Sequence, residues 1–159
     1  MPIESISKKR KRMAFIMSIL KQEYPDAHCS LEYKSSFQLL VSTILSAQCT
    51  DERVNKVTKG LFSKYSTPDD FAQLPIETIK KEIYSTGFYN NKAKSIKGMA
   101  VSVMEQHSGK LPKTLDEMVK LPGVGRKTAN VVMGNVFGIP SLVVDTHVTR
   151  IANLLKFVK

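Results

Sequence analysis

Apolar residues recur every three or four positions along most of this 159-residue chain, a spacing that places them on one face of an α-helix. The sequence has no sustained alternation of apolar and polar residues between hairpin turns, which would indicate β-strands. The apolar stripes are Met13, Ile16, Met17, Leu20 and Tyr24; Phe37, Leu40, Val41, Ile44 and Leu45; Val54, Val57, Leu61 and Phe62; Ala93, Ile96, Met99, Ala100, Val103 and Met104; and Val148, Ile151, Ala152 and Leu155. The pattern therefore predicts an all-α fold in which each stripe packs into a core.

Capping residues mark several boundaries between these helices. Ser35 or Ser36 is expected to cap the helix that follows it. Residues 67–70, Thr-Pro-Asp-Asp, predict the start of a short helix, because proline is tolerated in a first turn whose N–H groups have no partner within the helix. Thr114 and Glu117 have the spacing of a capping box, in which each side chain accepts a backbone N–H from the other residue.

The charge balance of the chain is strongly basic. It has 24 lysine and arginine residues against 14 aspartate and glutamate residues, a formal net charge of +10, which indicates a polyanionic partner. An anionic membrane surface is the alternative, but no stretch approaches the ~20 apolar residues of a spanning helix. The basic cluster at residues 8–12 lacks the uninterrupted apolar run of a secretory signal, so we expect a solvated basic arm and no signal peptide.

Cysteine content argues against a metal site or a disulfide framework. The two cysteines, Cys29 and Cys49, are too few for either, and His28 beside Cys29 has no partners at ligand spacing. We therefore expect no metal within this chain and a reducing compartment.

The segment Leu121-Pro122-Gly123-Val124-Gly125 predicts a tight hairpin that leads into a helix. Glycine tolerates positive φ and lets another backbone come close. The first N–H groups of the helix have no partner within it, and together with the positive end of the helix dipole they can bind a phosphate. A simple turn between two helices is the alternative interpretation.

One carboxylate stands out in the basic region that follows. Asp145 is the only acidic residue between Met118 and Lys159, and it directly precedes the last apolar stripe. It can cap the helix that begins there, or it can have a chemical role, or both.

Four segments, in this order, resemble the helix-hairpin-helix DNA glycosylase superfamily, and most closely its endonuclease III branch. They are Leu45-Ser46-Ala47-Gln48-Cys49-Thr50-Asp51, Gly87-Phe88-Tyr89-Asn90-Asn91-Lys92-Ala93, the segment from Leu121 to Asn130, and Val144-Asp145-Thr146-His147 with Val148 and Arg150. Together these segments extend over most of the chain.

The resemblance implies a helix-hairpin-helix glycosylase fold with a six-helix barrel lobe at residues 29–139, which contains the helix-hairpin-helix at about 114–137. Residues 1–28 and 140–159 are then the remaining parts of a second, incomplete lobe, and the lesion pocket lies between the lobes. Relatives continue past this length and bind a [4Fe-4S] cluster through four cysteines, a cofactor that this chain is expected to lack. The apolar face of the first helix is expected to lack part of its cover.

The resemblance also implies roles for individual residues. Lys127 is expected to attack C1′ of the damaged nucleotide as a neutral amine, a form favoured by burial and by the neighbouring helix N-terminus, and Asp145 to stabilise the developing positive charge. Gln48 and Phe88 are expected to wedge into the base stack. The other expected DNA contacts are Gly123, Val124, Gly125, Arg126 and Thr128, and the expected pocket residues are Ser46, Asp51 and His147. The alternatives are a phosphate contact for Lys127, a core position for Phe88, and helix caps for Ser46 and Asp51.

The function implied is base excision repair by a monomer in the bacterial cytosol or nucleoid. The enzyme would remove oxidised or ring-damaged pyrimidines from double-stranded DNA and cleave the abasic site by β-elimination. Lys127 favours this bifunctional branch over the adenine-removing branch, which generally lacks a lysine there. The rival hypotheses are a non-enzymatic helix-hairpin-helix module that binds the duplex backbone, and an inactive, truncated glycosylase.

Overall fold

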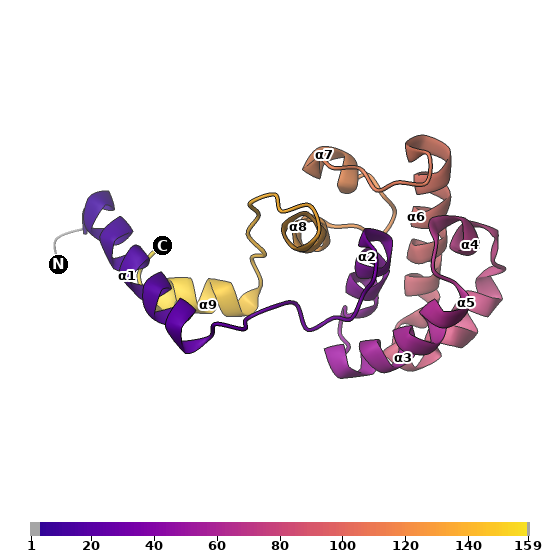
Figure 1. Cartoon of the computed structure of the whole chain (residues 1–159), viewed down its shortest axis with the longest axis horizontal. Coiled ribbons are helices and arrows are strands. Elements are labelled where there is room, and N and C mark those ends of the chain that lie inside the picture. The colour runs from indigo at the N-terminus through magenta and orange to yellow at the C-terminus, as the bar shows by residue number, and fades with distance from the viewer. Residues whose placement is uncertain (1–3, 159) are drawn as a thin grey trace. The chain divides into compact units, whose positions relative to one another are not determined.

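The computed structural model describes residues 4–158 and divides the chain into two compact units. The larger unit is Ser30–Asp145, and the smaller unit combines Met1–Cys29 with Thr146–Lys159. Every regular element among residues 4–158 is a helix, as Figure 1 shows. The larger unit contains α2 (Ser36–Leu45), α3 (Asp51–Lys64), α4 (Pro68–Gln73), α5 (Ile76–Ile83), the 3-10 helix η1 (Tyr84–Thr86), α6 (Tyr89–His107), α7 (Leu115–Met118) and α8 (Arg126–Asn135). The division falls after Asp145, whereas the expected lobe boundary was after Ile139.

Two helices, α2 and α6, form the centre of the larger unit (Figure 1). Helix α2 packs against α3, α6 and α8, so nearly all of its residues are buried, including the polar Gln38 and Ser42. Helix α6 packs against α2 on one side and against α4 and α5 on another. Its apolar stripe, from Ala93 through Ile96, Met99 and Ala100 to Val103, is fully buried, as the sequence predicted.

A lysine on α6 holds the end of α4. The Lys97 ammonium donates hydrogen bonds of 2.6 Å to the backbone oxygens of both Ala72 and Leu74. The last carbonyls of a helix have no partner within it and carry its partial negative charge, so a cation there is stabilising. The ring of Phe71 on α4 is fully buried and lies 5.5 Å from the ring of Phe37, which joins α4 to α2.

The predicted helix starts are confirmed at α2, α4 and α7, although the capping box expected at α7 is only half formed. The Ser35 side chain caps α2, and Thr67 with Asp70 forms a full capping box at α4. The backbone N–H groups of Ser66 and Thr67 donate to Asp70 and, with the Thr67 hydroxyl, lower the pKa of that carboxyl. At α7 the Thr114 hydroxyl caps the helix by accepting the Glu117 N–H at 3.4 Å, as predicted. The Glu117 carboxylate accepts from the Thr114 hydroxyl instead of the Thr114 backbone N–H, so the reciprocal half of the box is wrong.

The hairpin between α7 and α8 packs closely on α6. Gly123 has φ +74°, and a Cβ atom there would lie 2.3 Å from Ser95 Cβ. One turn along α6, Gly98 leaves room for Pro122, whose Cβ is 3.2 Å from where a Gly98 Cβ would stand. Leu121 is buried as well. Backbone conformation and packing therefore both require glycine at position 123.

The smaller unit is held together by polar contacts between α1 (Ile6–Glu23) and the residues after α9 (Thr146–Leu154). The Arg12 guanidinium pairs with Glu4 at 2.7 Å, donates to the Leu155 backbone oxygen and lies over the Phe157 ring. This ion pair lowers the pKa of Glu4. The expected solvated basic arm is therefore wrong for Arg12, which is a structural residue of a helix.

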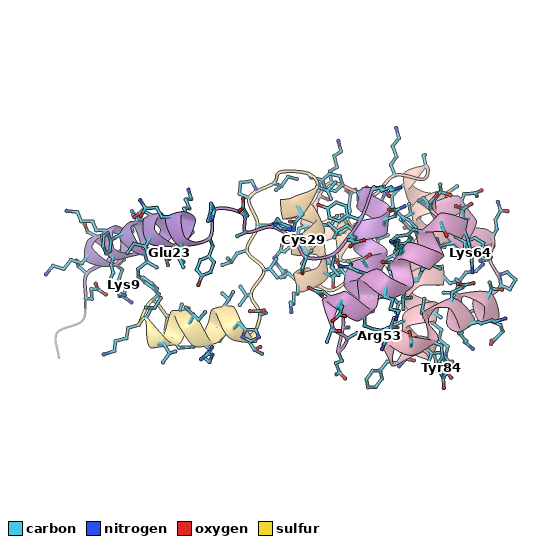
Figure 2. All side chains as sticks on the ribbon, turned by 60° about the horizontal axis from the view of Figure 1, so that its bottom comes forward. Lys9, Glu23, Cys29, Arg53, Lys64 and Tyr84 are labelled. Carbon is cyan, nitrogen blue, oxygen red and sulfur yellow. The ribbon has the colours of Figure 1, made fainter. Side chains whose placement is uncertain are left out.

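No residue of α1 is buried in the structure. Met13, Met17 and Leu20 are 40%, 45% and 43% exposed, so the core packing predicted for this apolar stripe is wrong. The stripe of α9 buries no residue either. Figure 2, in which Lys9 and Glu23 mark α1, shows side chains projecting from all sides of the helix. Within residues 4–158, no helix has both the length and the apolar character needed to cross a lipid bilayer.

The two hairpin glycines allow a matched test of this packing. We expect Gly123→Ser to lower the free energy of unfolding by ~1–3 kcal/mol, because the new Cβ meets Ser95 and the residue keeps a strained positive φ. Gly125→Ser should leave stability unchanged or slightly raised, because Gly125 has φ −86°, open space beside it and an N-cap position that serine favours. Urea unfolding of both variants measures the difference, and equal losses would contradict the packing argument.

Candidate functional site

A pocket of about 280 Å³ in the larger unit collects several of the predicted site residues. Its lining comes from the end of α2 with the turn after it, the start of α6, the hairpin and α8. The lining residues are Thr43, Ile44, Ala47, Gln48, Phe88, Asn91, Lys92, Ser95, Gly123 and Thr128. Two other pockets in this unit, each about 350 Å³, contain none of the predicted residues. Four predicted DNA contacts from distant parts of the sequence therefore lie around one depression.

Two of these residues, Gln48 and Phe88, have a left-handed backbone, with φ +54° and φ +48°. Non-glycine residues seldom adopt this conformation, and it persists only where the surrounding structure holds it. Phe88 is 65% exposed, so its alternative interpretation as a core aromatic is wrong. Gln48 and Phe88 therefore present their side chains to solvent at the rim of one pocket.

Two aromatic rings, one on each side of Phe88 in the sequence, contact each other at the loop that contains it. Tyr84 in η1 and Tyr89 at the start of α6 have ring centroids 4.7 Å apart. Tyr84 projects outward at the surface of the larger unit (Figure 2). Gly87, between these residues, has φ +70°, which lets the chain reverse before Phe88.

Lys92 is a pocket residue that the sequence did not single out. Its side chain is only 5% exposed, and its ammonium donates to the Leu45 backbone oxygen at 2.8 Å and to the Thr86 backbone oxygen at 2.7 Å. Burial lowers the pKa of Lys92, with a smaller opposing electrostatic effect from Cys49. The available signal was its spacing, because Lys92 falls four residues before Ile96 and so continues the apolar stripe of α6.

The N-terminus of α8 follows the hairpin directly and is open to an external acceptor. Gly125 is its N-cap and provides no side-chain hydrogen bond, so the first N–H groups of the helix have no side-chain acceptor at the cap. Arg126 and Lys127, the first two residues of α8, are both exposed, whereas Thr128 is half-buried. Val124 is buried and its backbone N–H donates to the Leu121 oxygen at 3.1 Å, so neither its side chain nor its N–H remains for the predicted DNA contact.

Lys127 is thus exposed in the structure, not buried as expected. An exposed amine beside a hairpin can reach a substrate atom that docks there.

Asp145 ends a non-helical segment that runs back along α8. Asn130 donates to the Leu142 backbone oxygen at 2.9 Å, and its own backbone oxygen accepts from the Ser141 hydroxyl at 2.8 Å. Asn130 lies one helical turn after Lys127. The segment that leads to Asp145 is therefore fastened to α8 one turn from Lys127.

The three predicted pocket residues lie elsewhere. The Ser46 hydroxyl donates to the Thr43 backbone oxygen at the end of α2, and Asp51 begins α3 and accepts from the Ser30 hydroxyl. Neither lines the pocket described above. Ser46 is the C-cap of α2, in agreement with its alternative interpretation, whereas the N-cap of α3 is Thr50 and not Asp51. His147 is exposed and belongs to α9 in the smaller unit.

Comparison with known proteins places these features in one family. Residues 41–159 match the family model described as HhH-GPD superfamily base excision DNA repair protein. The chain is 48% identical to endonuclease III of Synechocystis sp. over 99% of its length, which is 72% of that protein, and 46% identical to endonuclease III of Bacillus subtilis over 91% of its length, which is 66% of that protein. It thus spans about two thirds of the length of these relatives. A solved structure of a non-covalent endonuclease III–DNA complex is similar with a TM-score of 0.88 and 45% identity, covering 94% of this chain and 70% of that one.

The left-handed backbone at Gln48 can be tested by substitution. We expect Gln48→Gly to keep or raise the free energy of unfolding by up to ~1 kcal/mol, because glycine removes a left-handed penalty of ~1–2 kcal/mol and the exposed side chain packs little. Gln48→Val should lower it by ~1–3 kcal/mol, since a β-branched residue is strained there. Urea titrations of both variants measure these changes, and a marked loss in Gln48→Gly would show that the side chain is a packing element.

Proposed function

The chain belongs to the HhH-GPD superfamily of base excision DNA repair proteins, and we propose that it is a bifunctional DNA glycosylase and abasic-site lyase of the endonuclease III kind. Its substrates would be oxidised or ring-damaged pyrimidines in double-stranded DNA. The observation that carries the proposal is the position of Lys127, exposed as the second residue of α8 directly after the hairpin. A lysine there is a nucleophile placed beside a backbone that can hold the DNA phosphates.

The proposed reaction begins with extrusion of the damaged nucleotide, because a base inside the duplex is out of reach. The exposed Gln48 and Phe88 are suited to fill the gap that it leaves. The hairpin N–H groups and the exposed Arg126 then hold the backbone without reading its sequence.

Lys127 carries the covalent chemistry in this proposal. Its neutral amine forms a bond to C1′ as the bond from C1′ to the damaged base breaks, and the base leaves with a proton. Ring opening of the sugar gives a Schiff base between Lys127 and C1′. Loss of a C2′ proton then expels the 3′ phosphate by β-elimination, and water releases the lysine. Asp145 would stabilise the positive charge that develops on the sugar.

We propose that this chemistry uses no cofactor held by these residues, because two cysteines are too few for the four-thiolate ligand set of a [4Fe-4S] cluster. A single copy of the chain carries every residue assigned a role here, so we propose that it acts as a monomer, at the bacterial chromosome in the cytosol or nucleoid.

Borohydride trapping tests the assignment of Lys127. A Schiff base is reduced to a stable amine, so wild-type protein should become covalently linked to a duplex that contains thymine glycol or an abasic site. Lys127→Gln should form no adduct and lose strand cleavage by ~10³-fold or more, while its DNA affinity falls by ~10-fold at most, because only one potential phosphate contact is removed.

Lys120→Gln is the matched control for that experiment, because Lys120 is exposed before the same hairpin and the substitution removes the same charge. It should keep the adduct. DNA binding by wild-type protein without any adduct would favour the non-enzymatic module, and an adduct that persists in Lys127→Gln would refute the assignment.

The role of Asp145 can be separated from helix capping by Asp145→Asn. Asparagine caps helices about as well as aspartate, so we expect the melting temperature to change by less than about 3 °C. Loss of the negative charge should slow base excision by ~10²-fold. Single-turnover excision and thermal melting of the same preparation measure the two effects, and an equal loss of both would support a purely structural role.

A further inference from the structure

We propose that Lys92 is a positioning residue that ties together the two loops carrying Gln48 and Phe88, and so sets the geometry with which these side chains enter the DNA stack. The inference rests on the proposed function, since it gives Lys92 a role in the base-extrusion step. Lys92 acts through the backbone of the two loops, because its ammonium donates to carbonyl oxygens at their stems.

The contacts of the Lys92 ammonium join segments far apart in the sequence. It donates to the backbone oxygen of Leu45, the last residue of α2, three residues before Gln48. It also donates to the backbone oxygen of Thr86, the last residue of η1, two residues before Phe88. Lys92 therefore anchors both loops from one side chain.

The burial of this lysine needs an explanation. Lysine is seldom as buried as the 5% exposure of Lys92, because removing an ammonium group from water is unfavourable. Among residues 4–158, the hydrogen bonds of this ammonium go to neutral backbone oxygens, and it forms no salt bridge with a carboxylate. A Leu or Met side chain would fill the same space in the α6 stripe without that penalty. Packing alone therefore does not account for Lys92.

The two loops explain why a lysine is buried at position 92, because each loop contains a residue with a strained backbone. Gln48 and Phe88 have positive φ and are exposed, so their own side chains add few contacts to hold them. Strained backbone persists only where neighbouring bonds determine it. Hydrogen bonds from Lys92 to carbonyls two and three residues away hold the stem of each loop, and a common donor fixes the separation of the stems.

Lys97 provides a matched control. It lies on the same helix, and its ammonium also donates to two backbone oxygens, those of Ala72 and Leu74. These oxygens belong to the end of α4, which contributes no residue to the pocket. Lys92→Met and Lys97→Met therefore delete the same kind of bonds from α6, but only the first deletion affects the loops of Gln48 and Phe88.

The test compares two reactions of the 159-residue protein under single-turnover conditions. One is excision of thymine glycol from a fully paired duplex, which requires extrusion of a stacked base. The other is cleavage of the same duplex with an abasic site already in place, where extrusion is easier. We expect Lys92→Met to slow excision by ~30-fold and abasic cleavage by less than ~3-fold. Lys97→Met should leave the ratio of the two rates unchanged.

A second measurement asks whether Lys92 acts through the wedge residues. The double variant Lys92→Met with Phe88→Ala should be no slower in excision than the slower single variant, because residues that act as one unit have non-additive effects. Multiplicative losses would overturn the inference. If Lys92→Met does not fold, Lys92→Gln takes its place in every measurement, because its shorter side chain keeps donors but cannot reach both oxygens.

The outcomes separate this inference from the proposed function. Wild-type protein that performs neither reaction refutes the proposed function, and the inference with it, before any variant is compared. Active wild-type protein with an unchanged rate ratio in the Lys92 variant refutes only the inference. An equal fall in the ratio of excision to abasic-site cleavage in Lys97→Met also refutes the inference, since the slower excision then results from general destabilisation of α6.

Discussion

The packing of α6 between α2 and the α4–α5 pair is the constraint on which the larger unit depends. One face of α6 is a continuous apolar stripe, and the ends of other helices are attached along its length. Lys92 holds the end of α2, Lys97 holds the end of α4, and the surface at Ser95 and Gly98 receives the hairpin. Because these attachments share one rigid helix, segments distant in the sequence keep fixed positions relative to one another.

The pocket on this face combines backbone conformations that are uncommon elsewhere in the chain. Gln48, Phe88 and Gly123 line it, and all three have positive φ. At Gly123 the absent side chain removes the strain and permits contact with Ser95, whereas at Gln48 and Phe88 a side chain is kept in spite of it. Strain of this kind accords with the proposed task of inserting side chains into a base stack, which needs exposed groups on a firm backbone.

The smaller unit is stabilised by different means. Its helices bury no residue, and Arg12 joins α1 to the residues after α9 through a hydrogen bond to the Leu155 oxygen and a contact with the Phe157 ring, while its ion pair with Glu4 is local to the start of α1. Exposed ion pairs contribute little to stability, typically ~0–1 kcal/mol each. The larger unit, which contains every buried apolar residue of the described chain, is therefore expected to supply most of the folding free energy.

Sequence by itself determined the helical architecture, the hairpin and the family, because these depend on local features. Periodic apolar residues specify the buried face of α6, a proline in the first turn marks the start of α4, and Gly123 permits a turn that other residues resist. The motifs around Lys127 and Asp145 are likewise continuous in the sequence, so they identified the candidate chemistry before the fold was known.

Tertiary structure alone decided which residues meet and how far each is buried. In the sequence, Lys92 is one of many lysines in a basic chain. Only folding brings its ammonium to the backbone oxygens at the ends of α2 and η1, which lie 47 and 6 residues away in sequence. The exposure of Lys127 and the helix-terminal places of Ser46 and Asp51 were also undetermined. Burial and hydrogen bonding between distant segments depend on the packing of whole helices, which no local pattern specifies.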